Sequence, residues 1–292
     1  MRRLAREGCA LLTVDRRTLD LRDQAATERW IKSNQPDGII MAAAAVGGIE
    51  ANRSRPEEFL YDNLMMSANV IHAAAQRGVS KLLYLGSSCI YPRMAAQPIA
   101  PDALLTGALE QTNEAYAIAK IAAIKLAQYY RIQNGCDFIS AMPCNLYGPG
   151  DRFDALNSHV IPALMMKFHE AVRRGDQTVR LWGTGSPLRE FMHVDDLAEA
   201  LVFLLCEYSG DAPVNAGSGQ EISIRDLALL MAEITGYAGR IEFDPAMPDG
   251  APRRVLDSGA LRAMGWAPAI SLRDGLAATY EWYRRAGGSR AA

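Results

Sequence analysis

The sequence predicts an α/β protein built on a doubly wound parallel sheet, and three observations support this fold class. Apolar runs of strand length alternate with helical patterns along the first half of the chain. The runs at 38–43, 82–85 and 138–143 are largely apolar, as in parallel strands that helices cover on both faces. Polar residues follow the runs at 82–85 and 138–143, where ligands gather in open α/β sheets. Together they predict a Rossmann-like sheet with right-handed crossovers.

The composition argues against several classes of function. The 292 residues carry a net charge of −2, which gives no electrostatic case for nucleic acid or an anionic membrane surface. No apolar run reaches the roughly 18 residues of a membrane-spanning helix, and no signal-peptide segment follows Met1. Five scattered cysteines without a Cys-x-x-Cys pair predict a reducing, cytoplasmic location. Four histidines without ligand spacing predict no metal site.

The N-terminal part alternates between helix and strand. Residues 1–8 are typical of the end of a helix that stops at Gly8, and residues 9–14 of a strand. The elements expected next are a helix at 23–33, a strand at 38–43, a helix at 57–76, a strand at 82–85, a helix at about 113–134 that ends at Gly135, and a strand at 138–143.

A smaller C-terminal α/β substrate domain is expected after Gly150. Its elements are a helix at 162–174, a strand at 178–182, a helix to Glu207 capped by Asp195 or Asp196, a helix at 224–235 capped by Ser223, a strand at 239–243, and helices near 258–264 and 271–286. We expect a cofactor domain made of residues 1–152 plus roughly 189–212. Residues 153–188 and 213–292 would form the substrate domain.

Two motifs predict the chemistry. Residues 85–92, LGSSCIYP, place Ser87 and Cys89 directly after a strand. Tyr116 and Lys120 stand four residues apart in a helix, so they share a face, and Lys120 is expected to lower the Tyr116 pKa from about 10. Either motif alone is a modest signal, since each occurs in ordinary helices and turns. In this order they predict carbonyl reduction with proton abstraction next to the carbonyl.

From about residue 9 to 286 the chain resembles the extended short-chain dehydrogenase/reductase superfamily, and within it the GDP-L-fucose synthase family. Tyr-x-x-x-Lys defines only the superfamily, whereas Ser-Ser-Cys together with Asn-Ser-His is much narrower. The segments that carry the resemblance are AAAAVGGIEAN (42–52), LGSSCIYP (85–92), NEAYAIAK (113–120), NLYGPGD (145–151), NSHVIPAL (157–164), LREFMHVDDLA (188–198) and PDGAPRRVLD (248–257).

The resemblance implies a reaction in two stages. C3 and C5 of a GDP-4-keto-6-deoxy-mannose ring are epimerised, and NADPH then delivers hydride to C4. Removing a proton from one face and returning one to the other suits two separate groups, which the resemblance identifies as Cys89 (base) and His159 (acid). Ser87 would hydrogen-bond the C4 oxygen, Tyr116 would protonate it, and Lys120 would tune Tyr116 and hold the nicotinamide ribose.

The resemblance also implies binding residues and a homodimer. The cofactor NADP(H) would contact Arg16, Leu85, Gly86, Ser87, Ser88, Lys120, Pro143, Cys144, Asn145, Leu146 and His159. The GDP-sugar would contact Lys167, Trp182, Arg189, Asp249 and Arg254. Arg16 points to NADP because arginine accommodates a 2′-phosphate, whereas Asp15 would favour NAD. Lys167 stands where an arginine is expected in much of the family. Dimers would form through the helix of Tyr116 and the helix before it.

One expected element is missing from the printed sequence. A dinucleotide fold begins with a strand and a glycine-rich turn that holds the pyrophosphate at a helix N-terminus. Here a helix end stands first, and the nearest glycine pair, Gly47-Gly48, follows a later strand. We favour a start encoded upstream. A real loss would instead leave exposed strand edges and no pyrophosphate cradle.

Two other functions compete with the epimerase/reductase. A nucleotide-sugar 4-epimerase or 4,6-dehydratase would share the Ser, Tyr and Lys, but dehydratases place acids after the serine, where this chain has Cys89. A non-catalytic remnant that binds a nucleotide sugar is supported by the missing glycine loop. The identity of the product distinguishes the epimerase/reductase from a 4-epimerase or 4,6-dehydratase. Measurable NADPH turnover would exclude the non-catalytic remnant.

Overall fold

A parallel four-stranded sheet forms the N-terminal half of the protein in this computed structural model, which describes residues 1–154, 158–247, 249 and 251–287. The strand order is β1-β2-β3-β7, and every neighbouring pair runs parallel. Its strands are β1 (Gly38–Met41), β2 (Lys81–Leu85), β3 (Phe138–Pro143) and β7 (Val214–Ala216). All six residues of β3 are buried, as expected for a strand with a helix layer on each face.

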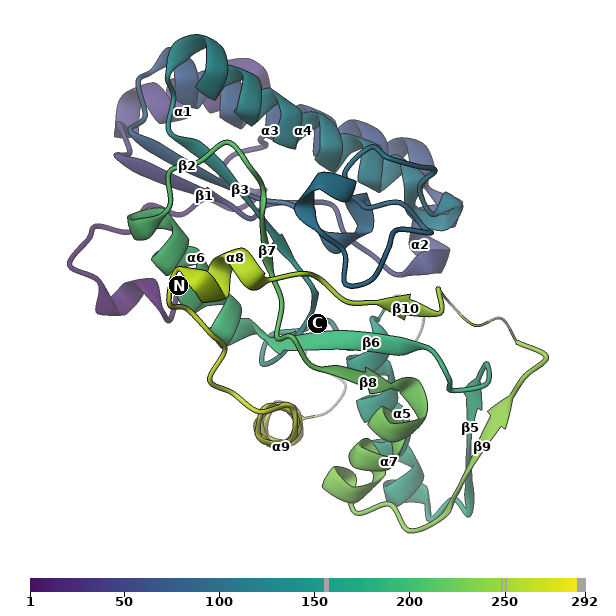
Figure 1. Ribbon diagram of the computed structural model, residues 1–292. Helices are drawn as coiled ribbons and strands as arrows, with labels where there is room; N and C mark the ends of the chain where they lie inside the picture. The colour runs from purple at the N-terminus through teal and green to yellow at the C-terminus, as the bar shows by residue number, and fades with distance from the viewer. Residues whose placement is uncertain (155–157, 248, 250, 288–292) are drawn as a thin grey trace.

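Helices cover both faces of this sheet (Figure 1). One face carries α1 (Gln24–Asn34), α3 (Pro56–Gln76) and α4 (Glu114–Asn134). The other face carries α6 (Val194–Glu207) and α8 (Gly259–Ala263). This arrangement confirms the predicted doubly wound α/β fold. None of the helices in the described ranges is long and apolar enough to cross a membrane.

The C-terminal half is a smaller α/β layer below the first sheet in Figure 1. Strand β6 (Leu188–His193) lies between β10 (Arg253–Arg254) and β4 (Asn145–Tyr147), parallel to both, and also pairs antiparallel with β8 (Glu221–Ser223). A separate parallel pair is formed by β5 (Thr178–Trp182) and β9 (Arg240–Asp244). The helices of this half are α5 (Val160–Arg174), α7 (Ile224–Thr235) and α9 (Leu272–Arg285).

The buried apolar residues form two clusters. One lies around the first sheet and includes Leu82, Phe138 and Leu204. The other joins α5, α7 and α9 through residues such as Phe168 and Leu227. Strand β7 and helix α8 pack with the first cluster although they follow residue 212 in the chain. The division into cofactor and substrate domains stays a prediction.

The predicted strand at 9–14 is wrong. These residues form no strand, and Leu12 is 49% exposed. A strand needs a hydrogen-bonding partner, and in the described residues β1, the edge strand, pairs only with β2. The expected helix end at 1–8 is a three-residue 3₁₀ helix, Leu4–Arg6, and Arg2 and Arg3 beside it form ion pairs with Asp195 and Glu199 of α6.

The predicted N-cap of α6 is also wrong. His193 occupies that position, and its Nδ1 accepts a hydrogen bond from the Asp195 N–H at 3.2 Å. The Asp196 carboxylate instead accepts from the N–H groups of Ala269 and Ile270, at 3.1 and 3.0 Å. The Asp196 side chain, which the local pattern assigned to capping, therefore binds a segment more than 70 positions away in the chain instead.

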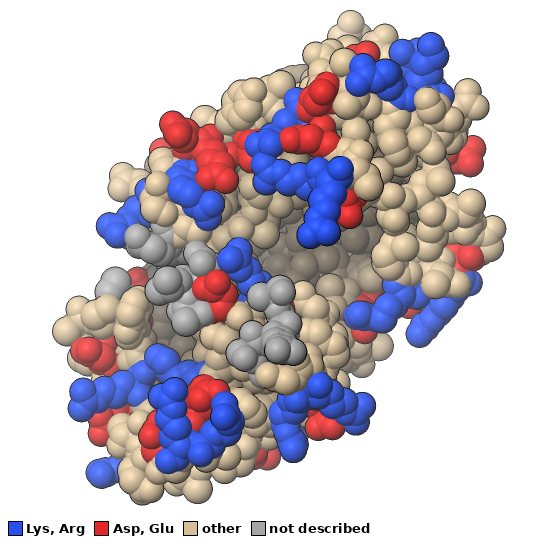
Figure 2. Space-filling view, turned by 180° about the vertical axis from the view of Figure 1, so that it is seen from behind, with Lys and Arg blue, Asp and Glu red and all other residues tan. Residues whose placement is uncertain are grey.

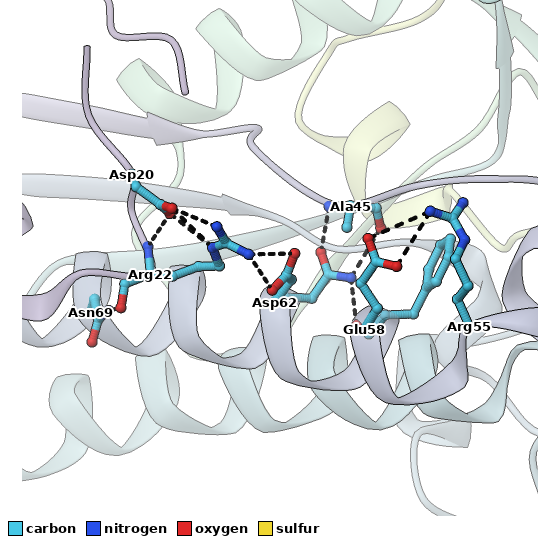
Figure 3. A network of polar contacts seen from close by, with 9 residues as sticks. Asp20, Arg22, Ala45, Arg55, Glu58, Asp62 and Asn69 are labelled. Carbon is cyan, nitrogen blue, oxygen red and sulfur yellow. Dashed lines mark hydrogen bonds and ion pairs between the residues drawn. The ribbon is translucent and has the colours of Figure 1, made fainter. Parts of the chain in front are cut away.

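Polar residues of α3 bind the segment that leads into α1 (Figure 3). The Asp62 side chain is 8% exposed and accepts from the Arg22 guanidinium at 2.9 Å, while Asp20 binds the same guanidinium at 2.6 Å. The Asn69 amide donates to the carbonyls of Leu21 and Arg22. Breaking such a pair would leave a buried charge without a partner, so these contacts fix the segment firmly on α3.

The same helix holds the loop that follows β1. Asn63 is buried, and its side-chain oxygen accepts from the Ala45 N–H at 2.8 Å. Its amide donates to the carbonyls of Ala45 and Phe59, at 3.0 and 2.7 Å. The carboxyl edge of the sheet, where ligands gather in this fold, is thus partly built by α3.

Candidate functional site

The turn after β2 places the predicted reactive residues at the carboxyl edge of the sheet. Ser87 caps a short 3₁₀ helix, Ser88–Ile90, by accepting from the Cys89 N–H at 3.2 Å. Gly86 lies directly against β3: a Cβ added there would stand 2.3 Å from the Met142 sulfur. A larger residue at this position would therefore require the end of the Met142 side chain to move. The Ser87 and Cys89 side chains that follow are both half-buried.

Helix α4 brings Lys120 to the same place. Its ammonium is almost fully buried and donates to the Leu85 carbonyl at 2.8 Å. It lies 4.8 Å from the Tyr84 ring centre and 5.8 Å from that of Tyr116. Burial lowers the pKa of Lys120 to about 8. The amine has three donors, and in the described residues a single carbonyl accepts from it, so it is suited to bind hydroxyl groups of a ligand.

The expected lowering of the Tyr116 pKa is wrong. Burial raises the pKa of this phenol, the charges of Cys89 and Tyr84 add to the rise, and a hydrogen bond with Ser87 opposes it. Removing the phenolate from water is costly, and the Lys120 ammonium is directed to the Leu85 carbonyl instead. Tyr116 thus lies close enough to Ser87 and Cys89 to interact with both, and Lys120 stands 5.8 Å from its ring centre. Their catalytic roles stay a prediction.

The strand end after β3 forms a second wall. Cys144 is buried, its N–H donates to the Ala216 carbonyl at 3.0 Å, and burial raises the pKa of its thiol well above the usual value. Asn145 and Leu146 continue into β4, and the Asn145 amide donates to the Glu190 carbonyl at 3.3 Å. With Pro143, these residues lie at the carboxyl edge next to Leu85 and Gly86, since β2 and β3 pair in register there.

A basic pair approaches the turn from the C-terminal half. Arg254 of β10 and Arg189 of β6 are register partners, and burial together with the Arg254 charge lowers the pKa of Arg189. The Arg254 guanidinium donates to the Ser88 carbonyl at 3.0 Å. Two neighbouring guanidinium groups repel one another unless an anion lies between them, and arginine binds diphosphates in a bidentate manner. This pair therefore forms a candidate anion site beside the reactive turn.

Of the other expected substrate residues, Asp249 lies close enough for its charge to oppose the lowering of the Arg189 pKa, whereas Lys167 and Trp182 lie at β5. Lys167 donates to the Arg180 carbonyl of β5 at 3.0 Å, and burial lowers its pKa. Trp182 at the end of β5 is 69% exposed. The Asp249 carboxylate accepts from the N–H and the hydroxyl of Thr184, at 3.0 and 2.7 Å. Pro248 and Gly250 of the same motif lie outside the described residues.

His159 and Arg16 are exposed and make no described contact with the Ser87–Cys89 turn. His159 occupies the N-cap position of α5 without a side-chain capping bond. It stands near Asp151. Burial raises the pKa of Asp151, and the charge of His159 opposes this rise. Asn157 of the Asn-Ser-His motif lies outside the described residues. Arg16 belongs to an exposed turn in which Asp15 accepts from two backbone N–H groups.

The hollow between the two halves is visible in Figure 2. Its floor consists of uncharged residues, and both basic and acidic side chains stand at its rim. The groups at Leu85 and Lys120 fit the ribose end of a nicotinamide cofactor, because Lys120 retains unused donors there. For the pyrophosphate, no glycine-rich turn between a parallel strand and a long helix occurs in the described ranges; the short α2 (Ile49–Ser54) follows Gly48 instead.

Comparison with known proteins identifies the class. The model of the NAD dependent epimerase/dehydratase family matches residues 1–217, and the chain belongs to this family. The family and an NADP-bound relative support a nicotinamide cofactor.

The more specific similarity is to GDP-L-fucose synthases. GDP-L-fucose synthase 1 of Arabidopsis thaliana is 56% identical over 284 residues, covering 97% of this chain and 88% of that protein. GDP-L-fucose synthase of Escherichia coli K12 is 49% identical, covering 91% and 85%. The structure of a GDP-L-fucose synthetase from Naegleria fowleri bound to NADP has a TM-score of 0.88 at 27% identity, covering 96% and 86%. These findings confirm the resemblance drawn from the motifs.

Sequence reasoning missed Glu190. This acid stands inside β6, fully buried, and accepts hydrogen bonds from two other segments. The strand also carries Arg189 and His193, so no local pattern in the sequence marked Glu190 as buried.

Proposed function

We propose that this chain converts GDP-4-keto-6-deoxy-D-mannose into GDP-L-fucose by epimerisation at C3 and C5 followed by reduction at C4. The observation that supports this most strongly is the convergence of Ser87, Cys89, Tyr116 and Lys120 beside the Arg189–Arg254 pair. A thiol beside a carbonyl-binding hydroxyl suits proton abstraction next to the carbonyl. A basic pair close to that turn suits the diphosphate of the same substrate.

Each residue has a proposed proton or binding role. Cys89 removes the protons at C3 and C5 as a thiolate, and His159, which is exposed at the rim, returns a proton to the opposite face. Ser87 donates a hydrogen bond to the C4 oxygen, which stabilises the negative charge that forms there. Tyr116 keeps its proton because its pKa is raised, so it can donate that proton to the same oxygen. Bound NADPH supplies the hydride for C4.

The cofactor is proposed to be NADP(H), with Lys120 on the ribose hydroxyls and the 85–88 and 143–146 strand ends forming the wall of its site. Arg16 is the proposed contact for the 2′-phosphate, supported by its residue type and by the NADP-bound relative. Trp182 exposes a large aromatic face that suits stacking on a base, and Lys167 and Asp249 complete the proposed substrate set.

A product assay tests this function. The chain is incubated with GDP-4-keto-6-deoxy-D-mannose and NADPH, the loss of NADPH is followed, and the nucleotide sugar is identified by NMR. We expect GDP-L-fucose, and GDP-4-keto sugar epimerised but unreduced when NADPH is omitted. A product epimerised only at C4, or a dehydrated product, would refute the proposal. Absence of NADPH turnover would favour the non-catalytic alternative.

We also propose that the chain forms a homodimer through α3 and α4. These neighbouring helices expose large apolar side chains at Tyr61, Ile118, Tyr129 and Ile132. Light scattering of the purified chain should give a dimer mass that Ile132→Asp reduces to a monomer. A cytoplasmic location is proposed from the five free thiols, which suit a reducing compartment.

A further inference from the structure

The carboxylate of Glu190 connects three segments of the C-terminal half. The residue has no exposed surface, and burial raises its pKa. One oxygen accepts from the Gly219 N–H at 2.6 Å and the other from the Leu256 N–H at 2.9 Å. No basic side chain forms an ion pair with it in the described ranges, and Arg262 acts only from a distance. Burying an acid without a counter-ion is costly, so the two backbone bonds have to offset much of this cost.

One of these bonds fixes the strand that carries Arg254. Strand β10 is only two residues long. The residues after it are also held from the other side, because Val255 and Asp257 form backbone hydrogen bonds with Ile99 at 2.8 Å. Leu256 follows Arg254 by two residues, so the bond to Glu190 extends the attachment of β10 to β6. The Arg254 guanidinium in turn donates to the Ser88 carbonyl at 3.0 Å. A continuous set of contacts thus runs from Glu190 through Arg254 to the reactive turn.

We propose that Glu190 is a positioning residue that fixes Arg254 and, through it, the Ser87–Cys89 turn. Arg254 then has two tasks, because the same guanidinium faces the candidate anion site and holds the Ser88 carbonyl. Occupation of the anion site and placement of the Cys89 thiol are therefore coupled. The role of Arg254 in binding an anion rests on the proposed function. Its role in holding the Ser87–Cys89 turn does not.

The test uses Glu190→Gln in the full chain. Glutamine has the same shape, but it offers one acceptor oxygen and turns an NH₂ group toward the second N–H donor. We expect GDP binding, measured by calorimetry, to weaken about tenfold, as for loss of a hydrogen bond to a charged group. We also expect the alkylation rate of Cys89 by iodoacetamide, followed by peptide mass spectrometry, to change about threefold or more, while exposed Cys9 keeps its rate.

Glu221→Gln is the matched control. Glu221 pairs with Arg253, the neighbour of Arg254 on the same two-residue strand, at 2.7 Å. Glu221 is also the register partner of Glu190, and its charge adds to the rise of the Glu190 pKa. The control therefore removes a neighbouring acid while both backbone bonds of Glu190 stay in place. Both readouts should stay within about twofold of wild type, since partly exposed ion pairs contribute little. If Glu190→Gln behaves like Glu221→Gln, the proposal is refuted.

A second variant covers the case in which Glu190→Gln does not fold, as judged by circular dichroism. Arg254→Lys keeps the positive charge but shortens the reach to Ser88, so the Cys89 rate should change while part of the GDP affinity remains. An unchanged Cys89 rate would overturn the proposal. If the wild-type chain fails to bind GDP, the proposed substrate is wrong, and the alkylation rates still decide whether Glu190 and Arg254 hold the turn.

Discussion

The buried ammonium of Lys120 predicts an unusual dependence of stability on pH. Burial lowers its pKa from 10.5 to about 8, whereas in the unfolded chain the amine keeps its ordinary value. Below about pH 8 the amine is charged in both states, so the folded state bears the full cost of the buried charge. As the pH rises from about 8 toward 10.5, only the unfolded chain stays protonated, and stability therefore increases.

The magnitude follows from the size of the shift. A difference of about 2.5 pKa units corresponds to about 3 kcal/mol in full, and about 2 kcal/mol of it develops between about pH 7 and 9.5. The window closes near pH 10, because there the unfolded chain ionises its tyrosines while burial keeps the pKa of Tyr116 higher. Ionisation then favours the unfolded state, and the stability gained from Lys120 is lost again.

Urea unfolding of wild type and Lys120→Met across this pH range measures the effect. We expect the free energy of unfolding of wild type to rise by about 2 kcal/mol relative to the variant between about pH 7 and 9.5. Methionine is similar in length and has no charge to bury. Lys32→Met, which removes an exposed lysine of α1, should keep the wild-type slope. Parallel profiles for wild type and Lys120→Met would show that the reasoning about burial is wrong.

Three further predictions concern the surroundings of the site. Gly86→Ala should lower the free energy of unfolding by about 1–3 kcal/mol in urea titrations, because its Cβ would overlap the Met142 side chain. Adding Met142→Ala to the same chain should recover part of this loss. If the effects of the two substitutions are strictly additive, the packing argument is wrong. Asn63→Leu removes three hydrogen bonds and should destabilise by about 1–3 kcal/mol, with faster hydrogen exchange around Ala45; exchange unchanged there would show that another contact fixes the loop. Cys89→Ser should abolish solvent deuterium exchange into C3 and C5 of the substrate while leaving NADPH affinity unchanged; exchange at the wild-type rate would assign the base elsewhere.

Local pattern predicted most of the secondary structure because it reports burial. Residues 138–143 are largely apolar, and β3 occupies the same six positions with every residue buried. Ser223 and Gly135 have the local chemistry of a cap, and both cap helices as expected. The strand expected at 9–14 shows the limit of such reasoning. An apolar run becomes a strand only when another strand, often distant in sequence, is available to pair with it.

The candidate site likewise has a part that local spacing predicts and a part that depends on long-range contacts. The spacing of Tyr116 and Lys120 is local, and a single helix brings both residues to the strand end. By contrast, the bond from Arg254 to the Ser88 carbonyl joins residues 166 positions apart. No spacing rule reaches across that distance, and the two bonds of Glu190 also join residues 29 and 66 positions apart. The sequence identified the residue types of the anion site through resemblance, but their contact with the reactive turn required the fold.

The Tyr116 phenol shows why residue types predict a site better than its energetics. The sequence placed an ammonium on the same helix face, and attraction alone would lower the pKa of the phenol. In the fold, Lys120 directs its ammonium to the Leu85 carbonyl and stands 5.8 Å from the Tyr116 ring centre. Burial affects both groups, and it opposes the charged form of each: it raises the pKa of Tyr116 and lowers that of Lys120. The phenol is therefore kept as a neutral proton donor, which is the state that protonation of a carbonyl oxygen requires.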